Sequence, residues 1–326
     1  MAEKLRVLLI YPHLSSFIER DLDILSGQFE VVPFEYRGKK DLFGLMKNIL
    51  SADVNISWFS LGHATTATSL SKFFKKNSVV VAGGWDVVAM PEIGYGAMLD
   101  NRRIRKTRYA LKNAGKILAV SESTKQWVRK WVDRDDIILL YHGFDSERFA
   151  PKGAKEDMVL TVGTLKNEVT IRVKGLKTYV EAARLLPDVR FVLVGKHEPE
   201  ILKTWWGRAP SNLEILDFLP TEELIGLYQK SKVYAQLSYQ ESFGCALAEA
   251  MLCECVPVVT KRGAIPEVVG DTGLYVEYGD AEDTTSKIKE AMASDKGSAA
   301  RKRVTKLFPI EDRRQRLTKI IDDCLK

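Results

Sequence analysis

The residues best suited to chemistry lie in the stretch 240–251, which reads QESFGCALAEAM. It carries two carboxylates, Glu241 and Glu249, with seven residues between them. The Ala- and Leu-rich part predicts a helix, with Ser242 as its N-cap and Gly244 letting a ligand approach the backbone. Free amides at a helix start suit a phosphate, so the spacing indicates a ligand held at three points, as a sugar nucleotide would be. The alternative is an ordinary helix with a surface glutamate at each end.

Two cations precede a predicted helix in the same half of the chain. Arg172 suits a diphosphate through its bidentate guanidinium fork, and Lys174 suits it as a point charge. The alternative for this pair is a solvated loop. Other loops that follow predicted strands are Gly163, Gly195-Lys196-His197-Glu198, Leu219-Pro220 and 261–264. Because parallel strands end at one edge of a sheet, these loops are expected to converge there with Glu241.

Short apolar runs alternate with helical segments along the chain, which predicts parallel sheets with helices on both faces. Strands are predicted at 5–11, 29–34, 54–59, 79–82, 116–120 and 137–141, then at 158–162, 189–194, 213–219, 233–237, 256–260 and 274–278. Helices are predicted at 17–25, 42–50, 65–76, 102–114, 123–131, 176–186, 200–208 and 221–230, up to 252 in the glutamate stretch, at 265–269, and from 281 with a break at 308–309. Ser121 and Thr221 are the expected N-caps of two of these helices.

The polar stretch 149–157, with Pro151 and Gly153, predicts a domain boundary. The fold class is therefore α/β, with two doubly wound, Rossmann-like domains facing across a cleft, formed by residues 1–150 and 151–308. Ligands of such domains bind at the carboxyl ends of the strands.

Composition and charge narrow the class of protein. The chain has 326 residues, 45% hydrophobic and 28% charged, and a net charge of +6. This mild excess fits acidic ligands such as phosphates or anionic lipid and does not by itself indicate nucleic acid. The four cysteines form no metal or disulfide pattern, and no run is long enough to span a membrane or act as a signal peptide. A cytoplasmic protein is expected, with no metal site.

The second half of the chain resembles the donor-binding half of retaining glycosyltransferases of family 4, which have the GT-B architecture. The resemblance rests on four stretches in order: 162–175, 191–195, 241–249 and 262–270. The first half matches more loosely, through 142–149 and the loop Gly83-Gly84-Trp85-Asp86.

The resemblance implies transfer of a hexose from a UDP- or GDP-linked sugar to a saccharide or lipid acceptor bound by residues 1–150. It implies that no metal or other cofactor is needed, and that the helix 309–326 packs back on the first domain. Glu241 would bind the donor sugar, Glu249 the ribose, and Arg172 and Lys174 the diphosphate as it leaves. Further donor contacts are expected from Gly163, Thr164, Lys196, Leu219, Ser242, Phe243, Gly244 and Cys245.

The chain departs from the family pattern at several positions. Thr164 stands where an arginine is usual, and Gly83 stands where a catalytic histidine is usual. His63 and His13 are the candidate substitutes for that histidine. Ser15 replaces part of a glycine-rich loop, and Gly84 and Asp86 complete the acceptor-side candidates. The alternatives are a sugar-nucleotide-binding protein without transferase activity, or a phosphorylase or epimerase of the same fold.

Two basic segments of the first half are candidates for contact with the inner face of a membrane. Segment 102–108 reads RRIRKTR and segment 72–76 reads KFFKK. The alternatives are a solvated helix for the first and an ordinary helix end for the second.

Overall fold

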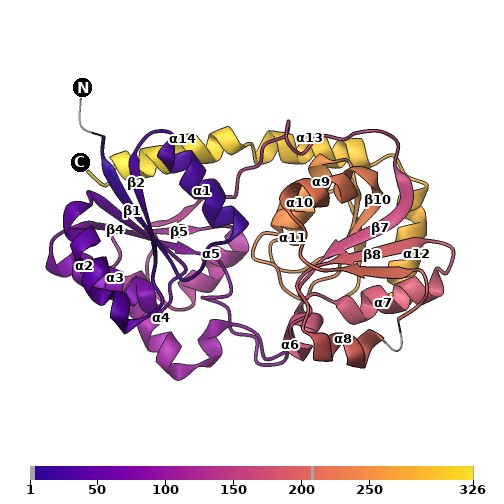
Figure 1. Cartoon of the computed structure of the whole chain (residues 1–326), viewed down its shortest axis with the longest axis horizontal. Helices are drawn as coiled ribbons and strands as arrows, with labels where there is room; N and C mark the ends of the chain where they lie inside the picture. The colour runs from indigo at the N-terminus through magenta and orange to yellow at the C-terminus, as the bar shows by residue number, and fades with distance from the viewer. Residues whose placement is uncertain (1–3, 207–208, 326) are drawn as a thin grey trace. The chain divides into compact units, whose positions relative to one another are not determined.

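The computed structural model describes residues 4–206 and 209–325, which form two compact units (Figure 1). Unit 1 runs to Gly143 and resumes at Ile310, and unit 2 is the continuous segment Phe144–Pro309. The first segment of unit 1 ends at Gly143, seven residues before the predicted boundary at residue 150. Residues 144–150 pack in unit 2 instead. Phe149 is buried there, and the guanidinium of Arg301 donates to its carbonyl at 2.8 Å.

Unit 1 is built on a parallel sheet whose described strands have the order β2-β1-β3-β4-β5-β6. The strands are β1 (Arg6–Tyr11), β2 (Glu30–Glu35), β3 (Val54–Trp58), β4 (Asn77–Ala82), β5 (Lys116–Ala119) and β6 (Ile137–Leu139). Strand β1 is apolar on both sides because both faces of the sheet are covered: Leu8 packs with α2 (Leu42–Ser51), and Leu9 with α1 (Ser16–Ser26). The chain reverses its direction of travel between β1 and β3, which makes this the switch point of the sheet.

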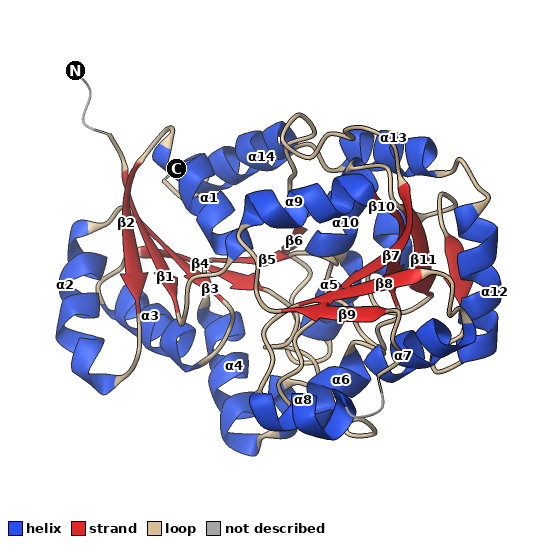
Figure 2. Ribbon diagram, turned by 45° about the vertical axis from the view of Figure 1, so that its right-hand side comes forward, coloured by secondary structure: helices blue, strands red, loops and turns tan. Residues whose placement is uncertain are grey.

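Helices cover both faces of that sheet (Figure 2). The remaining helices of unit 1 are α3 (Gly62–Phe73), α4 (Asn101–Asn113), α5 (Glu122–Arg129) and α14 (Ile310–Asp322), with short 3-10 turns at Lys39–Asp41 and Ala97–Leu99. Helix α14 returns to unit 1 and places Leu317 and Ile321 in the same cluster as β1. Ser121 caps α5 by accepting from the Thr124 amide at 3.0 Å, as predicted.

Unit 2 repeats the plan with the strand order β12-β11-β10-β7-β8-β9 among its described residues. Its strands are β7 (Glu156–Val162), β8 (Arg190–Val194), β9 (Leu213–Leu216), β10 (Ser231–Gln236), β11 (Val256–Thr260) and β12 (Leu274–Val276). All pairings are parallel. The switch point lies between β7 and β10, so the loops after these two strands start side by side. The two doubly wound sheets confirm the predicted fold class.

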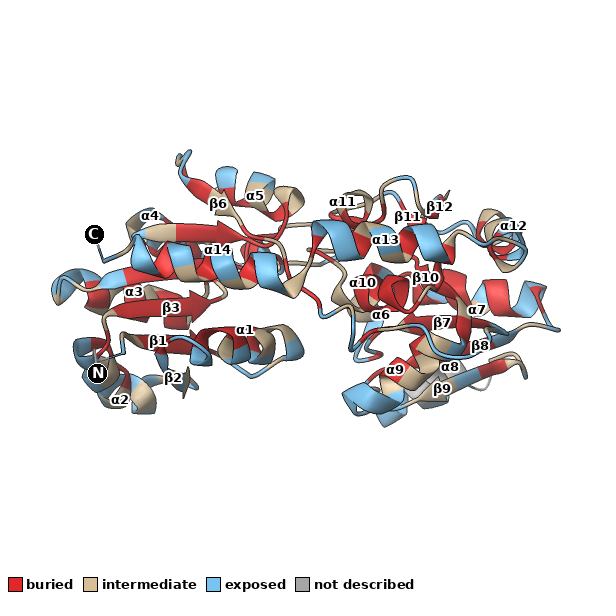
Figure 3. Cartoon of the chain, turned by 90° about the horizontal axis from the view of Figure 1, so that it is seen from above, coloured by how far each residue is buried: buried red, intermediate tan, exposed pale blue. Residues whose placement is uncertain are grey.

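The helices of unit 2 lie on both sides of its sheet, and their inward residues are buried while their outer faces are exposed (Figure 3). They are α6 (Glu168–Val173), α7 (Leu176–Leu185), α8 (Pro199–Trp206), α9 (Thr221–Lys230), α10 (Cys245–Leu252), α11 (Ile265–Val269), α12 (Ala281–Met292) and α13 (Gly297–Leu307). The apolar cluster that joins α7 and α12 to the sheet includes Tyr179, whose hydroxyl donates to the carbonyls of Val159 and Val192 at 2.8 Å.

Three local predictions in unit 2 are wrong. Helix α10 begins at Cys245 with Gly244 as its N-cap, because the cap has φ +96°, which a glycine adopts and Ser242 would not. Helix α9 begins with Thr221 itself after Pro220, and no side chain caps it. Strand β9 ends at Leu216 instead of reaching Leu219.

The sequence does not predict helix α6, because the segment around Arg172 has the pattern of a solvated loop before a helix. Its capping box pairs Asn167 with Thr170: the Asn167 side chain accepts from the Thr170 amide at 2.9 Å, and the Thr170 hydroxyl accepts from the Asn167 amide at 3.0 Å. A threonine at the fourth position is a weaker signal than the usual glutamate or glutamine.

Within the described residues, no helix has both the length and the apolar character needed to cross a bilayer.

Candidate functional site

The loops after the strands of unit 2 converge at the carboxyl edge of its sheet. Gly195 lies so close to the loop after β7 that a Cβ on it would meet the Gly163 carbonyl oxygen at 2.2 Å. The Leu165 amide donates to the Lys196 carbonyl at 2.8 Å, which joins the loops after β7 and β8. On the other side of the switch point, the Ala264 amide donates to the Glu241 carbonyl at 3.0 Å, which joins the loops after β11 and β10. The convergence expected from the sequence is therefore present in the structure.

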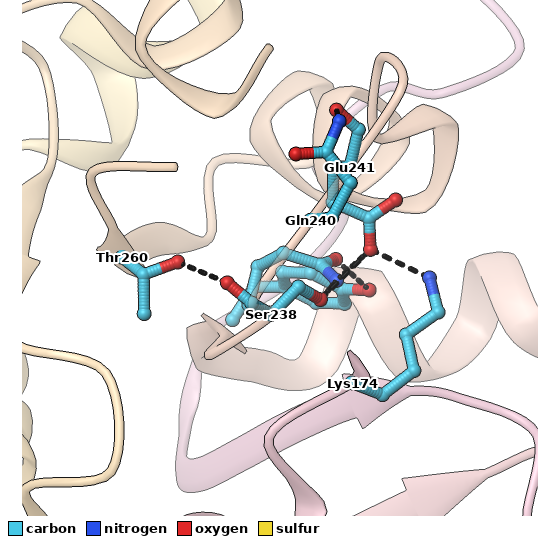
Figure 4. A network of polar contacts seen from close by, with 7 residues as sticks. Lys174, Ser238, Gln240, Glu241 and Thr260 are labelled. Carbon is cyan, nitrogen blue, oxygen red and sulfur yellow. Dashed lines mark hydrogen bonds and ion pairs between the residues drawn. The ribbon is translucent and has the colours of Figure 1, made fainter. Parts of the chain in front are cut away.

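Glu241 is the centre of a polar network at this edge (Figure 4). Its Oε1 accepts from Lys174 Nζ at 2.6 Å, from Gln236 Nε2 at 2.8 Å and from the Ser238 hydroxyl at 2.8 Å. The Thr260 hydroxyl in turn donates to the Ser238 carbonyl at 2.6 Å. Among the described residues Oε2 of Glu241 has no partner, so one oxygen is fixed and the other is available to accept from a ligand hydroxyl.

Lys174 is held in this network by a close backbone approach. Gly175 has φ +64°, and a Cβ there would lie 1.9 Å from the Leu237 carbonyl oxygen. The Tyr239 amide donates to the Val173 carbonyl at 2.7 Å. Because of these two contacts, the junction of α6 and α7 packs closely against the residues that follow β10. Glu241 lies in the same segment, so Lys174 comes within hydrogen-bond distance of it.

Arg172 lies in the last turn of α6 and its side chain is exposed. Its carbonyl accepts from the Tyr278 hydroxyl at 2.7 Å, which fixes the backbone. In the described part of the chain its guanidinium takes part in no ion pair and no hydrogen bond. The structure thus places Arg172 at the predicted edge but outside the network of Glu241.

The start of α10 is anchored through Phe243. This ring is buried, stacks on Phe144 with centroids 5.8 Å apart, and meets Phe308 edge-on at 5.2 Å. The first helical bond runs from the Ala248 amide to the Gly244 carbonyl at 3.0 Å, so the amides of residues 245–247 precede it. Phe243 is therefore an anchor, while the helix start beside it has the amides that suit an anion.

Glu249 is turned inward in α10, with 9% of its surface exposed. The Tyr228 hydroxyl donates to its Oε2 at 3.5 Å. Burial, and then the charge of Glu249, raise the pKa of Tyr228 well above its usual value, so this hydroxyl stays protonated. The predicted ribose contact would have to reach a carboxylate that already has a protein partner.

Residues 144–306 match the family model described as glycosyl transferases group 1. This is half of the chain, and it includes the whole network around Glu241. The chain belongs to the glycosyl transferases group 1.

Curated relatives agree with this family. The chain is 27% identical over 263 residues to the alpha-maltose-1-phosphate synthase of Mycolicibacterium smegmatis, covering 72% of this chain and 64% of that protein. It is 29% identical over 225 residues to the N-acetyl-alpha-D-glucosaminyl L-malate synthase of Bacillus anthracis, covering 63% and 58%. The chain thus spans somewhat less than two thirds of the length of these relatives.

Solved structures show the same fold. Anabaena HepE in complex with UDP and glucose aligns with a TM-score of 0.82 and 16% identity, over 98% of this chain and 100% of that one. The sucrose-phosphate synthase of Thermosynechococcus elongatus aligns with a TM-score of 0.77 and 16% identity, over 98% and 99%. The chain therefore has the GT-B fold expected from the sequence.

The loop Gly83–Asp86 of unit 1, predicted to lie on the acceptor side, is organised by Asp86, which is fully buried. One carboxylate oxygen accepts from the Ser60 amide and hydroxyl, both at 2.7 Å, and the other from the amides of Gly83 at 3.1 Å and Gly84 at 2.8 Å. Burial raises the pKa of Asp86 despite these bonds. Asp86 consequently stabilises the conformation of the loop, since both of its oxygens accept from groups of unit 1 itself.

The ring of Phe59 occupies the space beside Gly83. A Cβ on Gly83 would lie 2.4 Å from the Phe59 ring, and Phe59 itself has φ +67°, which is uncommon for an aromatic residue. The exposed imidazole of His13 stacks on this ring, with centroids 6.2 Å apart. The space that a side chain at position 83 would fill is therefore occupied by the Phe59 ring, which also contacts His13.

His63 lies below this edge. Only 5% of its surface is exposed, and its Nε2 donates to the Trp58 carbonyl at 2.6 Å. Burial lowers the pKa of His63 to about 4. A neutral imidazole engaged with the backbone suits packing better than proton transfer. Ser15 lies at the predicted helix start as the N-cap of α1, without a cap bond from its side chain.

The other residues predicted to contact the donor differ in their exposure to solvent. Lys196 is exposed and lies over the Phe218 ring at 5.5 Å, Leu219 is half-buried, and Thr164 is exposed. Sequence reasoning missed Gln236 and Ser238, which orient Glu241. Gln236 is a buried polar residue at the end of β10, directly after the apolar residues 233–235, which is the signal that could have identified it.

Two hollows of about 310 and 490 Å³ lie elsewhere, lined by residues such as Asp188, Glu214 and Ile288 near the amino ends of strands. They are remote from Glu241. In the described residues, no group of three or more His, Cys, Asp or Glu side chains is arranged to hold a metal ion.

Proposed function

We propose that this glycosyltransferase moves a hexose from a UDP- or GDP-linked sugar to a saccharide or lipid acceptor, with retention of anomeric configuration. Glu241 binds hydroxyls of the donor sugar, and Lys174 and Arg172 stabilise the negative charge of the leaving diphosphate. The amides at the start of α10 contribute to the same anion. Retention rests on the resemblance alone, and no covalent nucleophile is assigned.

The observation that carries this proposal is the half-engaged carboxylate of Glu241. Three donors converge on Oε1 and leave Oε2 open, which is how a carboxylate is oriented toward a ligand. The side chain of Glu241 is 11% exposed and that of Lys174 is 32% exposed, so both are partly desolvated and still accessible. An ordinary surface glutamate would have neither the donors nor the burial.

The test is release of nucleoside diphosphate from a panel of UDP- and GDP-sugars by the wild type and Glu241→Gln. The substitution keeps the shape of the side chain and removes its charge, so turnover should fall roughly 10²- to 10³-fold, as for other transition-state contacts. Glu277→Gln, an exposed carboxylate after β12, is the matched control and should keep full turnover. Full activity of Glu241→Gln would refute the assignment. Proton NMR of the first product gives its anomeric configuration.

Gly83 and Phe59 favour one alternative, a protein that binds a sugar nucleotide without transferring the sugar. The backbone at position 83 carries no side chain, and the Phe59 ring fills the adjacent space. In that case calorimetry would show tight binding of a nucleotide sugar while no nucleotide is released, even with acceptor extracts.

We also propose that transfer needs no metal or other cofactor. The support is the cationic character of the edge around Lys174, which can serve the leaving diphosphate directly. Turnover should persist in excess EDTA and should not rise when Mg²⁺ or Mn²⁺ is added. Loss of turnover in EDTA with recovery on adding Mn²⁺ would contradict the proposal.

Contact of unit 1 with an anionic membrane is a further part of the proposal. Helices α3 and α4 pack side by side (Figure 1). Phe73, with 79% of its surface exposed, is the last residue of α3 and follows Lys72. Helix α4 is rich in exposed cations and has no acidic residue: Arg102, Arg103, Arg105, Lys106, Arg108 and Lys112. The protein should sediment with phosphatidylglycerol vesicles and not with phosphatidylcholine vesicles, and Phe73→Ser should weaken this binding. Equal binding to both vesicles would exclude a charge-driven contact.

A further inference from the structure

We propose that Arg262 is a third cation for the diphosphate of the donor, held ready by a cradle of two tyrosines. This inference rests on the proposed function. The role concerns the anionic part of the donor and is separate from that of Glu241.

The cradle is made by Tyr239, just after β10, and Tyr278, just after β12. The Arg262 guanidinium carbon lies 4.2 Å from the centroid of Tyr239 and 5.4 Å from that of Tyr278. The two rings meet edge-on with centroids 4.9 Å apart. A guanidinium stacked on aromatic faces is fixed in orientation, while its N–H groups stay free at its rim.

The same tyrosines connect Arg262 to the site already described. The Tyr239 amide is bonded to the Val173 carbonyl at 2.7 Å, next to Lys174. The Tyr278 hydroxyl donates to the Arg172 carbonyl at 2.7 Å. Gly263, with φ +56°, brings the following backbone so close that a Cβ there would meet the Glu241 carbonyl oxygen at 2.4 Å. Arg262 is therefore built into the same edge as Glu241 and Lys174.

Charges around the cradle are unbalanced. Lys174 is already paired with Glu241. Within residues 4–206 and 209–325, the guanidiniums of Arg172 and Arg262 have neither a carboxylate partner nor a hydrogen-bond acceptor. Burial raises the pKa of Tyr278, and the nearby charges of Arg172 and Arg262 oppose that rise, which agrees with both cations lying beside this hydroxyl. Two uncompensated arginines at one edge suit a ligand with two or more negative charges.

The position of Arg262 also bears on Thr164. Position 164, in the loop after β7, is a threonine without charge, although that loop lies at the switch point next to Glu241. On the other side of β10, Arg262 supplies a guanidinium from the loop after β11. A diphosphate bound at this edge would then be neutralised from the side of β11 and α6, and not from position 164.

Calorimetry with UDP, GDP and ADP, and with the corresponding monophosphates, tests this assignment on the full chain. Arg262→Gln should weaken binding of the diphosphate that the wild type binds by roughly ten- to hundredfold, the usual worth of charge-assisted hydrogen bonds. The affinity for the monophosphate should fall by a smaller factor, and the affinity for the diphosphate should depend less steeply on salt concentration. Arg262→Lys should recover part of the affinity. The control Lys261→Gln removes the same charge from the exposed neighbour and should bind like the wild type.

A second variant separates binding from a structural role. Tyr239→Leu keeps the arginine and removes the ring beneath it, so the diphosphate should again bind more weakly. If Arg262 only packs the loops, Arg262→Gln will lower the melting temperature of the free protein but leave the ligand-induced rise unchanged, which overturns the inference. Unchanged diphosphate affinity in Arg262→Gln also overturns it. A wild type that binds none of the nucleotides overturns the proposed function as well, so the two failures are distinguishable.

Discussion

At the scale of single residues, the site depends on which oxygen of Glu241 is occupied. Ser238 both donates to Oε1 and accepts from Gln236 Nε2 at 2.7 Å, so it aligns two members of the network. Its own carbonyl is held by Thr260. Glu241 is thus oriented by a residue that need not touch a ligand.

Removing that hydroxyl should disorder Glu241 without removing its charge. We expect Ser238→Ala to lower turnover of the sugar nucleotide roughly tenfold, the value of one hydrogen bond to a charged group. Ser238→Thr, which keeps the hydroxyl, should recover most of the activity. Steady-state release of nucleoside diphosphate measures both, and unchanged turnover in Ser238→Ala would mean that Lys174 and Gln236 suffice.

Gly83 and Phe59 should behave as a coupled pair. Gly83→Ala places a methyl group 2.4 Å from the Phe59 ring and should cost about 1–3 kcal/mol of unfolding free energy, as overpacking does. In the background of Phe59→Gly, which also relieves the positive φ, the same substitution should cost much less. Urea unfolding of the two single variants and the double variant gives the coupling, and additive effects would show that the ring does not exclude a side chain at position 83.

The buried imidazole of His63 predicts a loss of stability in mild acid. Folded His63 takes up a proton only near pH 4, whereas in the unfolded chain it does so near pH 6.5. The unfolded state therefore binds more protons between these values, and stability falls as the pH drops through this window, by up to about 3 kcal/mol. His142, whose pKa burial also lowers, acts in the same direction.

The contribution of His63 can be isolated by substitution. His63→Asn keeps a donor for the Trp58 carbonyl and does not titrate, so its loss of stability between pH 7 and pH 4.5 should be smaller than that of the wild type. Urea midpoints at the two pH values give the comparison. Equal losses would mean that His63 is not buried in its neutral form.

The sequence predicted that Glu241 and Lys174 lie at the same edge of the sheet, because each follows the end of a strand and the strands are parallel. It did not predict the cradle of Arg262, since Tyr239, Arg262 and Tyr278 follow three different strands and meet only after the sheet has formed. The Phe59 ring beside Gly83 could not be foreseen for the same reason. Contacts between loops depend on strand order, which no single segment encodes.

At the scale of elements, the helices and strands with strong apolar periodicity were predicted to within one to three residues. The errors lie at helix starts and strand ends, where one backbone angle decides the outcome. Gly244 at φ +96° moved the start of α10, and the Asn167–Thr170 box created α6. The residues at which helices and strands begin or end therefore depend on local hydrogen bonds more than on the apolar pattern.

Helix α14 is fixed to unit 1 by an ion pair that is almost completely buried. Arg313 donates to both oxygens of Asp21, at 2.6 and 2.7 Å, and to the Tyr141 carbonyl at 2.6 Å, while Trp58 Nε1 donates to the same carboxylate at 3.1 Å. The two charged side chains are 2% and 3% exposed. Breaking such a pair leaves an uncompensated buried charge.

Arg313→Leu should therefore destabilise unit 1 by roughly 3–5 kcal/mol, whereas Arg313→Leu combined with Asp21→Asn should cost distinctly less. Arg314→Leu is the control on the same helix, because its ion pair with Glu311 is exposed to solvent. Thermal unfolding followed by circular dichroism measures the difference. A similar cost for both single variants would show that the pair does not anchor α14.

At the scale of the whole molecule, unit 2 is one continuous segment whose two ends meet. The Phe144 amide donates to the Phe308 carbonyl at 2.9 Å, and both rings pack on Phe243 of the glutamate stretch. Unit 2 is therefore closed on itself, and its connections to unit 1 leave from adjacent points of its surface.

A fragment of residues 144–309 should accordingly fold alone and retain nucleotide binding. We expect a single cooperative urea transition and an affinity for UDP or GDP within about tenfold of the full chain. The matching fragment 4–143, which lacks α14, should be unstable because Asp21 has lost its arginine. Failure of 144–309 to fold would show that the two units depend on one another for stability.

The return of α14 also sets an order of events during synthesis. Unit 1 is the first to be synthesised, but its buried carboxylate Asp21 has no ion-pair partner until Arg313 is added. The ribosome adds Arg313 only after all of unit 2. Asp21 and the apolar surface that α14 later covers are exposed during that interval. Unit 1 is thus the first unit to be synthesised and the last to complete its fold. A nascent chain stalled before residue 313 should be the form that chaperones bind.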